Sequence, residues 1–317
     1  GEQIGLNAGQ PLTGVQIDQL DDAALGERLA QTDVVARASP EHKLRLVATL
    51  QAQGRQVAMT GDGVNDAPAL KAADIGVAMG QRGTDAAREA ADLVLTDDNF
   101  ATIAAAVREG RTVFDNIKKS LLFVLPTNGG EAGLILAAVF AGLAMPVTAA
   151  QILWINMVTS ITLDISLAFE PAERGVMQRP PRPANEPLIT RWMLVRVVFV
   201  SLLLMGAAFF VFNWQLARGG SLEMARTSVI NMMVVGEIFY LFNVRHFTSS
   251  AFTRDNWMGN PVALGTVVVT LVLQMLLTYA PPMQRLFGTA ALDASTWGVI
   301  AALAGGMFLA VETEKWL

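Results

Sequence analysis

The sequence predicts an α/β domain with a parallel sheet, followed by an all-α bundle of six membrane-spanning helices. Short apolar runs alternate with helical stretches over residues 1–111, as in parallel sheets covered on both faces. Residues 112–317 instead contain six long apolar segments. The composition agrees, because hydrophobic residues reach 52% and charged residues only 16% of the 317 residues, which suits a membrane protein.

Composition also restricts the possible functions. The net charge of -5 gives no electrostatic reason to expect nucleic-acid binding. The absence of cysteine excludes thiol chemistry, disulfides and cysteine-ligated zinc. The chain starts with Gly1-Glu2-Gln3-Ile4, without Met, a basic region or an apolar signal core, so we expect it to be the interior of a longer chain.

The first domain is predicted to contain five short strands, at residues 15–17, 34–36, 56–60, 75–78 and 93–95. Helices are predicted between them, at residues 22–31, from 40 onward, at 67–72 and at 84–91. Ser39 is the expected N-cap of the second helix, with Pro40 at its first position. Leu44, Val47 and Leu50 should form the buried stripe of that helix.

The chemistry of this domain is predicted at residues 60–70, which read TGDGVNDAPAL and follow the apolar strand at 56–60. Open α/β sheets place their ligands at the carboxyl ends of such strands. Asp62 and Asp66 offer hard carboxylate oxygens, which suit Mg²⁺ together with water and phosphate. Gly61 and Gly63 allow a tight turn and a close approach to an anion or its metal. The alternative is an ordinary surface turn with an N-capping Asp.

Six apolar segments near the length needed to cross a bilayer are predicted at residues 120–144, 147–169, 192–214, 227–244, 261–281 and 295–312. Most flanking basic residues lie on one side, at Lys118, Lys119, Arg174, Arg179, Arg182, Arg191, Arg245, Arg254 and Lys315. Only Arg218, Arg226 and Arg285 fall on the other. The positive-inside rule therefore places the first domain and the C-terminus in the cytoplasm.

Polar residues inside these segments are costly, so each is a functional candidate. In the first segment, Pro126, Gly129 and Gly130 should loosen the helix and free carbonyl oxygens, while Asn128 and Glu131 share a face. The second segment carries four polar residues on one helical face, at Asn156, Thr159, Ser160 and Asp164. Two facing stripes of oxygen ligands, each with one carboxylate, would form a cation cage.

A structural role competes with this interpretation, because Asn, Thr and Ser often only form hydrogen bonds between membrane helices. This alternative applies best to Thr159 and Ser160, and less to Glu131, since a buried carboxylate is harder to explain. Glu237 in the fourth segment is a weaker candidate. Pairing with Asn231 or Asn243 would explain Glu237 equally well.

Residues 60–70 resemble the hinge motif of the P-type ATPases, which belong to the haloacid-dehalogenase-like phosphotransferases and have a Rossmann-type parallel sheet. The resemblance covers nearly the whole chain, including residues 39–43 (SPEHK) and 97–100 (DDNF), the latter similar to the start of the helical stalk that leads into the membrane. It implies that Asp62 binds Mg²⁺, with Thr60, Gly61 and Gly63 in the same cofactor-binding loop. The other catalytic positions that it implies are Asp66, Asn65 near the phosphoryl group, and Lys43, which pairs with the phosphorylated aspartate.

The membrane part also resembles one branch of this family. Residues 128–131 (NGGE) and 154–159 (WINMVT) are similar to the ion-ligand runs of calcium pumps, and residues 179–182 (RPPR) to their following cytoplasmic loop. The implied ligands of the transported cation are Asn128, Glu131, Asn156 and Thr159. Ser160 stands where calcium pumps have an aspartate, a loss for which Asp164 would have to compensate. Bacterial pumps of undefined cation specificity resemble the chain best, which implies a multi-pass protein of the bacterial inner membrane.

Several parts of the family have no counterpart in this sequence, namely the DKTGT motif with the phosphorylated aspartate, the nucleotide-binding and actuator domains, and four membrane helices. We therefore expect the C-terminal portion of an ATP-driven pump that uses Mg²⁺ and ATP, inactive by itself because it lacks the nucleophilic aspartate. Its expected partners are Ca²⁺ or another cation, the lipid bilayer and the missing N-terminal half. The alternative is a non-catalytic truncated paralogue that binds a cation or a pump subunit.

Overall fold

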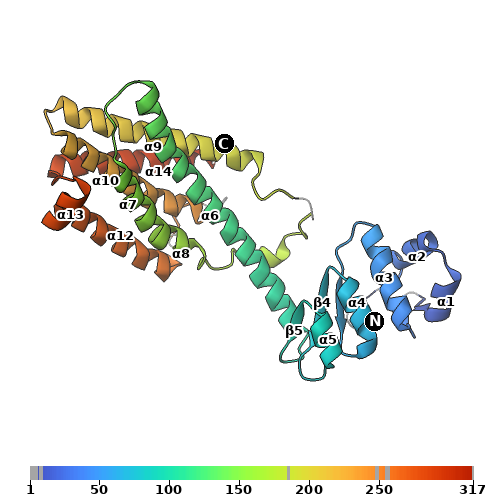
Figure 1. The fold of residues 1–317 in the computed structure, drawn as a ribbon. Coiled ribbons are helices and arrows are strands. Elements are labelled where there is room, and N and C mark those ends of the chain that lie inside the picture. The colour runs from blue at the N-terminus through green and yellow to red at the C-terminus, as the bar shows by residue number, and fades with distance from the viewer. Residues whose placement is uncertain (1–5, 7–9, 184–185, 247–249, 254–257, 316–317) are drawn as a thin grey trace. The chain divides into compact units, whose positions relative to one another are not determined.

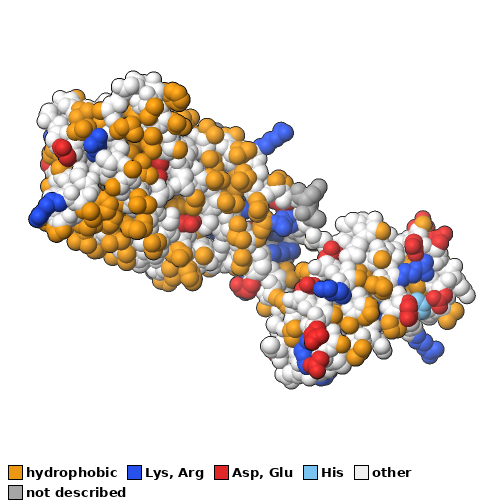
Figure 2. All heavy atoms as spheres, in the orientation of Figure 1, with side chains coloured by type: hydrophobic (Ala, Val, Ile, Leu, Met, Phe, Trp, Pro, Cys, Tyr) orange, Lys and Arg blue, Asp and Glu red, His pale blue; other side chains and the backbone are white. Residues whose placement is uncertain are grey.

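The computed structural model describes residues 6, 10–183, 186–246, 250–253 and 258–315 (Figure 1). Arg254, one of the basic residues used to predict the topology, lies outside this range. The chain divides into two compact units, residues 1–107 and 108–317. Figure 2 shows charged side chains spread over the first unit, and hydrophobic side chains over much of the visible face of the second.

The first unit begins with a two-stranded parallel sheet, in which β1 (Leu12–Thr13) pairs with β2 (Val35–Ala36). Three helices accompany it, α1 (Gly14–Gln19), α2 (Asp22–Leu29) and α3 (Pro40–Ala52). The strand predicted at residues 15–17 is wrong, because these residues lie in α1. Thr13 and Gln16 close a capping box there, which starts a helix and buries Ile17 on its inner face.

Helix α3 begins as predicted, with Ser39 as its N-cap and Pro40 at its first position. His42 completes a capping box, since its ring accepts a hydrogen bond from the Ser39 amide. The predicted apolar stripe is only partly correct. Val47 is buried, but Leu44 is 40% exposed.

The rest of the first unit is a three-stranded parallel sheet in the order β3 (Ala58–Gly61), β4 (Ile75–Met79), β5 (Leu93–Leu95). A short 3₁₀ turn (Val64–Asp66), α4 (Ala67–Ala72) and α5 (Asp85–Ala90) connect the strands. Side chains of β4 alternate between two small cores, with Ala78 in one and Val77 and Met79 in the other. This arrangement confirms the predicted α/β class with a parallel sheet.

In the part of the second unit that the structure describes, six helices are long and apolar enough to cross a membrane, which confirms the predicted helical bundle. They are α6 (Ala101–Phe140, which begins within the first unit), α7 with α8 (Ala149–Leu167), α9 (Arg191–Ala217), α10 (Leu222–Val244), α12 (Pro261–Tyr279) and α14 (Ala294–Glu314). Helix α10 packs against α9 and α14 (Figure 1). It is also the central helix. In its most apolar stretch 89% is buried, against 28–50% in the corresponding stretches of the other five helices.

The described part of the second unit also contains shorter helical elements. The π-helical turn Ser160–Asp164 separates α7 (Ala149–Thr159) from α8 (Ile165–Leu167). A 3₁₀ turn (Val176–Gln178) follows α8, and α13 (Pro281–Phe287) connects α12 to α14. Single π-helical turns inside α-helices occur frequently at functional sites.

Candidate functional sites

Asp66 is the centre of the loop that follows β3. Its side chain is 9% exposed, and its Oδ1 accepts a hydrogen bond from Lys43 Nζ at 2.5 Å. Its Oδ2 faces the amides of Asp62 and Gly63 at 3.3 and 3.2 Å. Burial opposes ionisation, but the hydrogen bonds from Lys43 and Gly63 hold the pKa of Asp66 below its ordinary value. Asp66 therefore orders the loop and fixes Lys43.

Gly61 allows the Asp66 side chain to fold back over the end of β3. A Cβ atom at position 61 would lie 2.5 Å from the Cβ of Asp66, a distance too short for two carbon atoms. Only glycine fits at this position without moving Asp66. The structure thus shows a packing role for Gly61 inside the loop, whereas its close approach to a ligand stays a prediction.

Asp62 and Asn65 project from the same loop and are exposed, and Thr60 is half-buried on β3. The Asp62 carboxylate has no hydrogen-bond or ion-pair partner among the described residues, whereas its backbone carbonyl accepts the Thr84 amide at 2.8 Å. The unpaired Asp62 carboxylate, on a backbone held by Thr84, offers hard oxygen donors that fit Mg²⁺. The side-chain amide of Asn65 on the same loop offers another oxygen. The loop thus holds Asp66 inward and presents Asp62 outward.

In the second unit, Glu131 on α6 meets Asn156 on α7. The Nδ2 of Asn156 donates to Glu131 Oε2 at 2.5 Å and lies 3.2 Å from the Ile152 carbonyl oxygen. Glu131 is 5% exposed, and Thr159, one turn beyond Asn156, is 6% exposed. The structure thus brings together three of the residues that the sequence proposes for the cation site.

Glu237 on α10 belongs with this group, although it was a weaker candidate in the sequence analysis. It is 1% exposed, and neither carboxylate oxygen has a hydrogen-bond partner among the described residues. Glu131 is the neighbouring carboxyl group, and Thr159 lies beside Glu237 but donates its hydroxyl proton to the Ile155 carbonyl. One feature of the sequence could have identified Glu237 as a site residue. It is a carboxylate within an apolar segment, with no Lys or Arg close to it in the sequence.

The alternative explanation of Glu237, pairing with Asn231 or Asn243, is wrong. Asn231 donates to the Thr227 carbonyl and to the Thr278 hydroxyl, at 2.8 and 3.0 Å. Asn243 donates to Glu312 at 3.0 Å, near the C-terminal end of α14. Both amides are therefore engaged elsewhere.

Among the described residues, no side-chain hydrogen bond joins the other three predicted ligands to this group. Asn128 and Ser160 are exposed, and Asp164 is half-buried beside Ser120 with its Oδ1 unpaired among the described residues. The prediction assumed regular helical spacing in the second segment. The π-helical turn Ser160–Asp164 adds a residue to the turn, which rotates the following side chains relative to Thr159.

The proline in α6 frees a carbonyl oxygen as predicted, but a side chain takes it. Pro126 has no N–H for the carbonyl of Leu122, four residues earlier. That carbonyl instead accepts a hydrogen bond from the Tyr240 hydroxyl on α10 at 2.7 Å. Gly130 serves packing, because a Cβ there would lie 2.9 Å from the Cβ of Leu204 on α9.

Carboxylates alone do not make up the candidate membrane site. Among the described residues, no three His, Cys, Asp or Glu side chains are grouped closely enough to hold a metal ion. A cation between Glu131 and Glu237 would therefore also need amide, hydroxyl or carbonyl oxygens. Asn156 and Thr159 are the neighbouring side chains that offer them.

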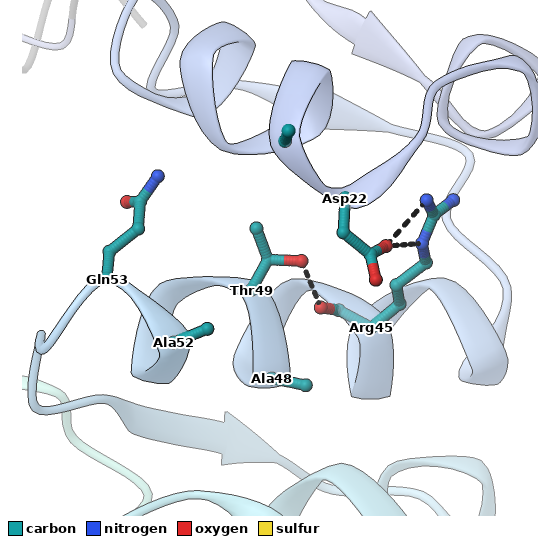
Figure 3. A pocket seen from close by; sticks show the side chains of 7 residues that line it. Asp22, Arg45, Ala48, Thr49, Ala52 and Gln53 are labelled. Carbon is teal, nitrogen blue, oxygen red and sulfur yellow. Dashed lines mark hydrogen bonds and ion pairs between the residues drawn. The ribbon is translucent and has the colours of Figure 1, made fainter.

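The first unit also has a cavity of about 490 Å³ between α2 and α3 (Figure 3). Seven residues line it, Asp22, Ala23, Arg45, Ala48, Thr49, Ala52 and Gln53. Arg45, its only basic residue, is already bound to Asp22 and to the carbonyls of Ile17 and Leu20. The cavity contains none of the predicted site residues.

Comparisons with known proteins match both units. Residues 144–317 match the family model described as cation transporting ATPase, C-terminus, and residues 10–74 match haloacid dehalogenase-like hydrolase. The chain is 49% identical to "Probable cation-transporting ATPase F" of Mycobacterium bovis, over 98% of this chain and 34% of that protein. It is 40% identical to "Calcium-transporting ATPase 1" of Schizosaccharomyces pombe, over 96% and 34%, and 38% identical to "Calcium-transporting ATPase" of Bacillus subtilis, over 93% and 33%. The chain spans about a third of the length of these relatives.

Proposed function

The chain belongs to the cation-transporting P-type ATPases, and we propose that it is the C-terminal part of a pump that couples formation and hydrolysis of an aspartyl phosphate to cation movement. The observation that carries this proposal is the pair of buried carboxyls, Glu131 and Glu237, in membrane-spanning helices. Among the described residues, neither forms an ion pair with Lys or Arg. Because an ionised carboxylate costs at least about 2.5 kcal/mol at the centre of a membrane helix, two adjacent ones favour binding a cation.

In the first unit, Asp62 would hold Mg²⁺ against the phosphoryl group, with Asn65 close to that group. The bound Mg²⁺ would offset the negative charge that this group carries during transfer. Lys43 uses one of its three ammonium protons on Asp66, which leaves two donors for phosphoryl oxygens. In this proposal, the hydrogen bond to Asp66 positions the Lys43 ammonium group. The contacts of Asp66 with the loop amides position Asp62.

We propose a hard cation such as Ca²⁺ as the transported ion. Two carboxyls with amide and hydroxyl oxygens suit Ca²⁺, which takes six to eight oxygen ligands. Two of the relatives compared above are named as calcium-transporting, which supports the same class of ion. From the distribution of Lys and Arg, we further propose a bacterial inner-membrane location with the first unit cytoplasmic.

The test is ATP hydrolysis by the full-length protein in membrane vesicles, with Ca²⁺, Mn²⁺, Na⁺ and K⁺ supplied separately. We expect one cation class to stimulate hydrolysis and to promote an acid-stable phosphoprotein. The 317-residue chain alone should form none, because it lacks the acceptor aspartate. Hydrolysis that is indifferent to every cation, or labelling of the chain alone, would refute the proposal.

A further inference from the structure

The loop of residues 80–83, between β4 and α5, lies against the candidate Mg²⁺ loop. The amide of Thr84, directly after it, donates to the Asp62 carbonyl at 2.8 Å. Apart from the strand pairing of β3 with β4, this hydrogen bond is the direct backbone link between the two loops among the described residues. The position of Asp62 therefore depends on what holds residues 80–83.

Asp98 holds the middle of this loop, although it lies 16 and 17 residues beyond the two residues that it contacts. Its Oδ1 accepts the Gln81 amide and its Oδ2 accepts the Arg82 amide, each at 2.9 Å. The Nε of Arg82 adds a contact at 3.2 Å. The Asp98 side chain is only 9% exposed, whereas that of Arg82 is 71% exposed. Because water screens the contact with the exposed Arg82 side chain, the two backbone amides are the more important partners of Asp98.

The backbone of Asp98 is also unusual. Its φ is +50°, in the left-handed region, which Asp tolerates better than most residues but which glycine adopts freely. The Leu95 carbonyl closes this turn, because it accepts both the Asp98 amide and the Gly80 amide, at 3.2 and 2.8 Å. The amides of Gln81 and Arg82 together hold the pKa of Asp98 below its ordinary value.

Two carbonyls of the loop are held by a residue of α5. Arg88 on α5 donates to the carbonyls of Gly80 and Gly83, at 2.9 and 2.5 Å. A Cβ atom at Gly83 would overlap the Met79 carbonyl oxygen, so the chain turns there only with glycine. Asp98 thus holds two amides of the loop, and Arg88 holds two of its carbonyls.

We propose that Asp98 is a positioning residue for Asp62. Its carboxylate fixes the amides of residues 81 and 82, and through the short connection to Thr84 it fixes the hydrogen bond that holds the Asp62 backbone. This inference rests on the proposed function, because it assumes that Asp62 binds Mg²⁺.

The neighbouring Asp97 provides a matched control. Among the described residues, its carboxylate forms hydrogen bonds only at and just before the start of α6, where it accepts the Asn99 amide at 3.1 Å and the Thr102 hydroxyl at 2.6 Å. It has no hydrogen bond to the 80–83 loop among the described residues. Two adjacent aspartates thus have different roles, one local and one directed at the candidate site.

The experiment compares Asp98→Gly and Asp97→Gly in the full-length pump. Glycine keeps the positive φ at position 98 available, so the substitution removes the carboxylate without imposing backbone strain. We expect Asp98→Gly to raise the Mg²⁺ concentration for half-maximal phosphorylation by about tenfold or more, as loss of outer-shell support does in metal sites. Asp97→Gly should leave this concentration unchanged.

Amide hydrogen exchange supplies a readout that does not depend on catalysis. Asp98→Gly should speed exchange at residues 81–84 and 62–66, and Asp97→Gly only around residues 99–103. An unchanged Mg²⁺ requirement in Asp98→Gly would overturn the inference, as would unchanged exchange at 62–66. Asp62→Asn separates this failure from failure of the proposed function. If Asp62→Asn also phosphorylates normally, the Mg²⁺ assignment itself is wrong.

Discussion

The two units treat their buried carboxylates in opposite ways. In the first unit, Asp66 is matched by Lys43 and faces two backbone amides, and Asp98 is matched by Arg82 and two amides. In the second unit, Glu131 has a single neutral amide as partner, and Glu237 has none among the described residues. Carboxylates that are paired with a basic side chain and backbone amides stabilise a loop. Carboxylates inside a membrane bundle that have no basic partner remain able to bind a cation.

The second unit can also compensate a carboxylate fully, which makes the contrast sharper. Glu170 and Arg245 are each 1% exposed and form an ion pair at 2.6 Å. Asn260 donates to the same Glu170 oxygen at 2.8 Å. The unpaired state of Glu131 and Glu237 is therefore not a general property of this bundle.

The largest expected effect concerns this ion pair. Arg245→Met leaves the Glu170 charge buried without its partner, which should destabilise the protein by about 3–5 kcal/mol. Glu237→Gln removes no partner and should leave the apparent melting temperature of the detergent-solubilised pump unchanged or higher. The double variant Arg245→Met, Glu170→Met should recover much of the lost stability. Equal destabilisation by Glu237→Gln and Arg245→Met would mean that Glu237 is a structural residue.

The next effect concerns the first unit. Asp62→Asn in the full-length pump should slow Mg²⁺-dependent phosphorylation by about 100-fold or more, because it removes a charge beside the phosphoryl group. Asp22→Asn is the control, since Asp22 is 79% exposed in a surface ion pair with Arg45. Phosphoenzyme levels measured with labelled ATP check both variants. Normal labelling in Asp62→Asn would show that the exposed carboxylate is not the metal ligand.

The smallest expected effect lies at Ser160, where the structure departs from the sequence-based expectation. Because Ser160, the first residue of the π-helical turn, is exposed, Ser160→Ala should change the apparent cation affinity by less than about twofold. Cation titration of ATP hydrolysis measures this. A tenfold loss of affinity would place Ser160 in the site and would weaken the distinction between buried and exposed polar residues in α7.

The sequence predicts well what depends on contiguous residues. The run 60–70 places its glycines and carboxylates in one loop, and six apolar segments suffice to predict the helical bundle. The strand expected at 15–17 failed because the capping box of Thr13 and Gln16 starts a helix there. Local side-chain hydrogen bonds outweighed the apolar pattern in this case.

Contacts between distant segments were harder to predict. The π-helical turn at Ser160–Asp164 breaks the helical spacing on which the ligand stripe was based. The real partners of Asn231 and Asn243 come from other helices, 47 and 69 residues along the chain. Asp98 accepts the amides of residues 81 and 82 from a left-handed backbone conformation. Such a conformation is usually indicated by glycine, and position 98 is not glycine.

The central claim, a cation site built on Glu131 and Glu237, is tested most directly by equilibrium binding of the stimulating cation to the full-length pump without ATP. We predict that Glu131→Gln and Glu237→Gln each weaken binding about tenfold or more, equivalent to about 1.4 kcal/mol. Glu223→Gln, at the exposed start of α10, should bind the cation like the wild type. Wild-type affinity in both Glu131→Gln and Glu237→Gln, in correctly folded protein, would contradict the account.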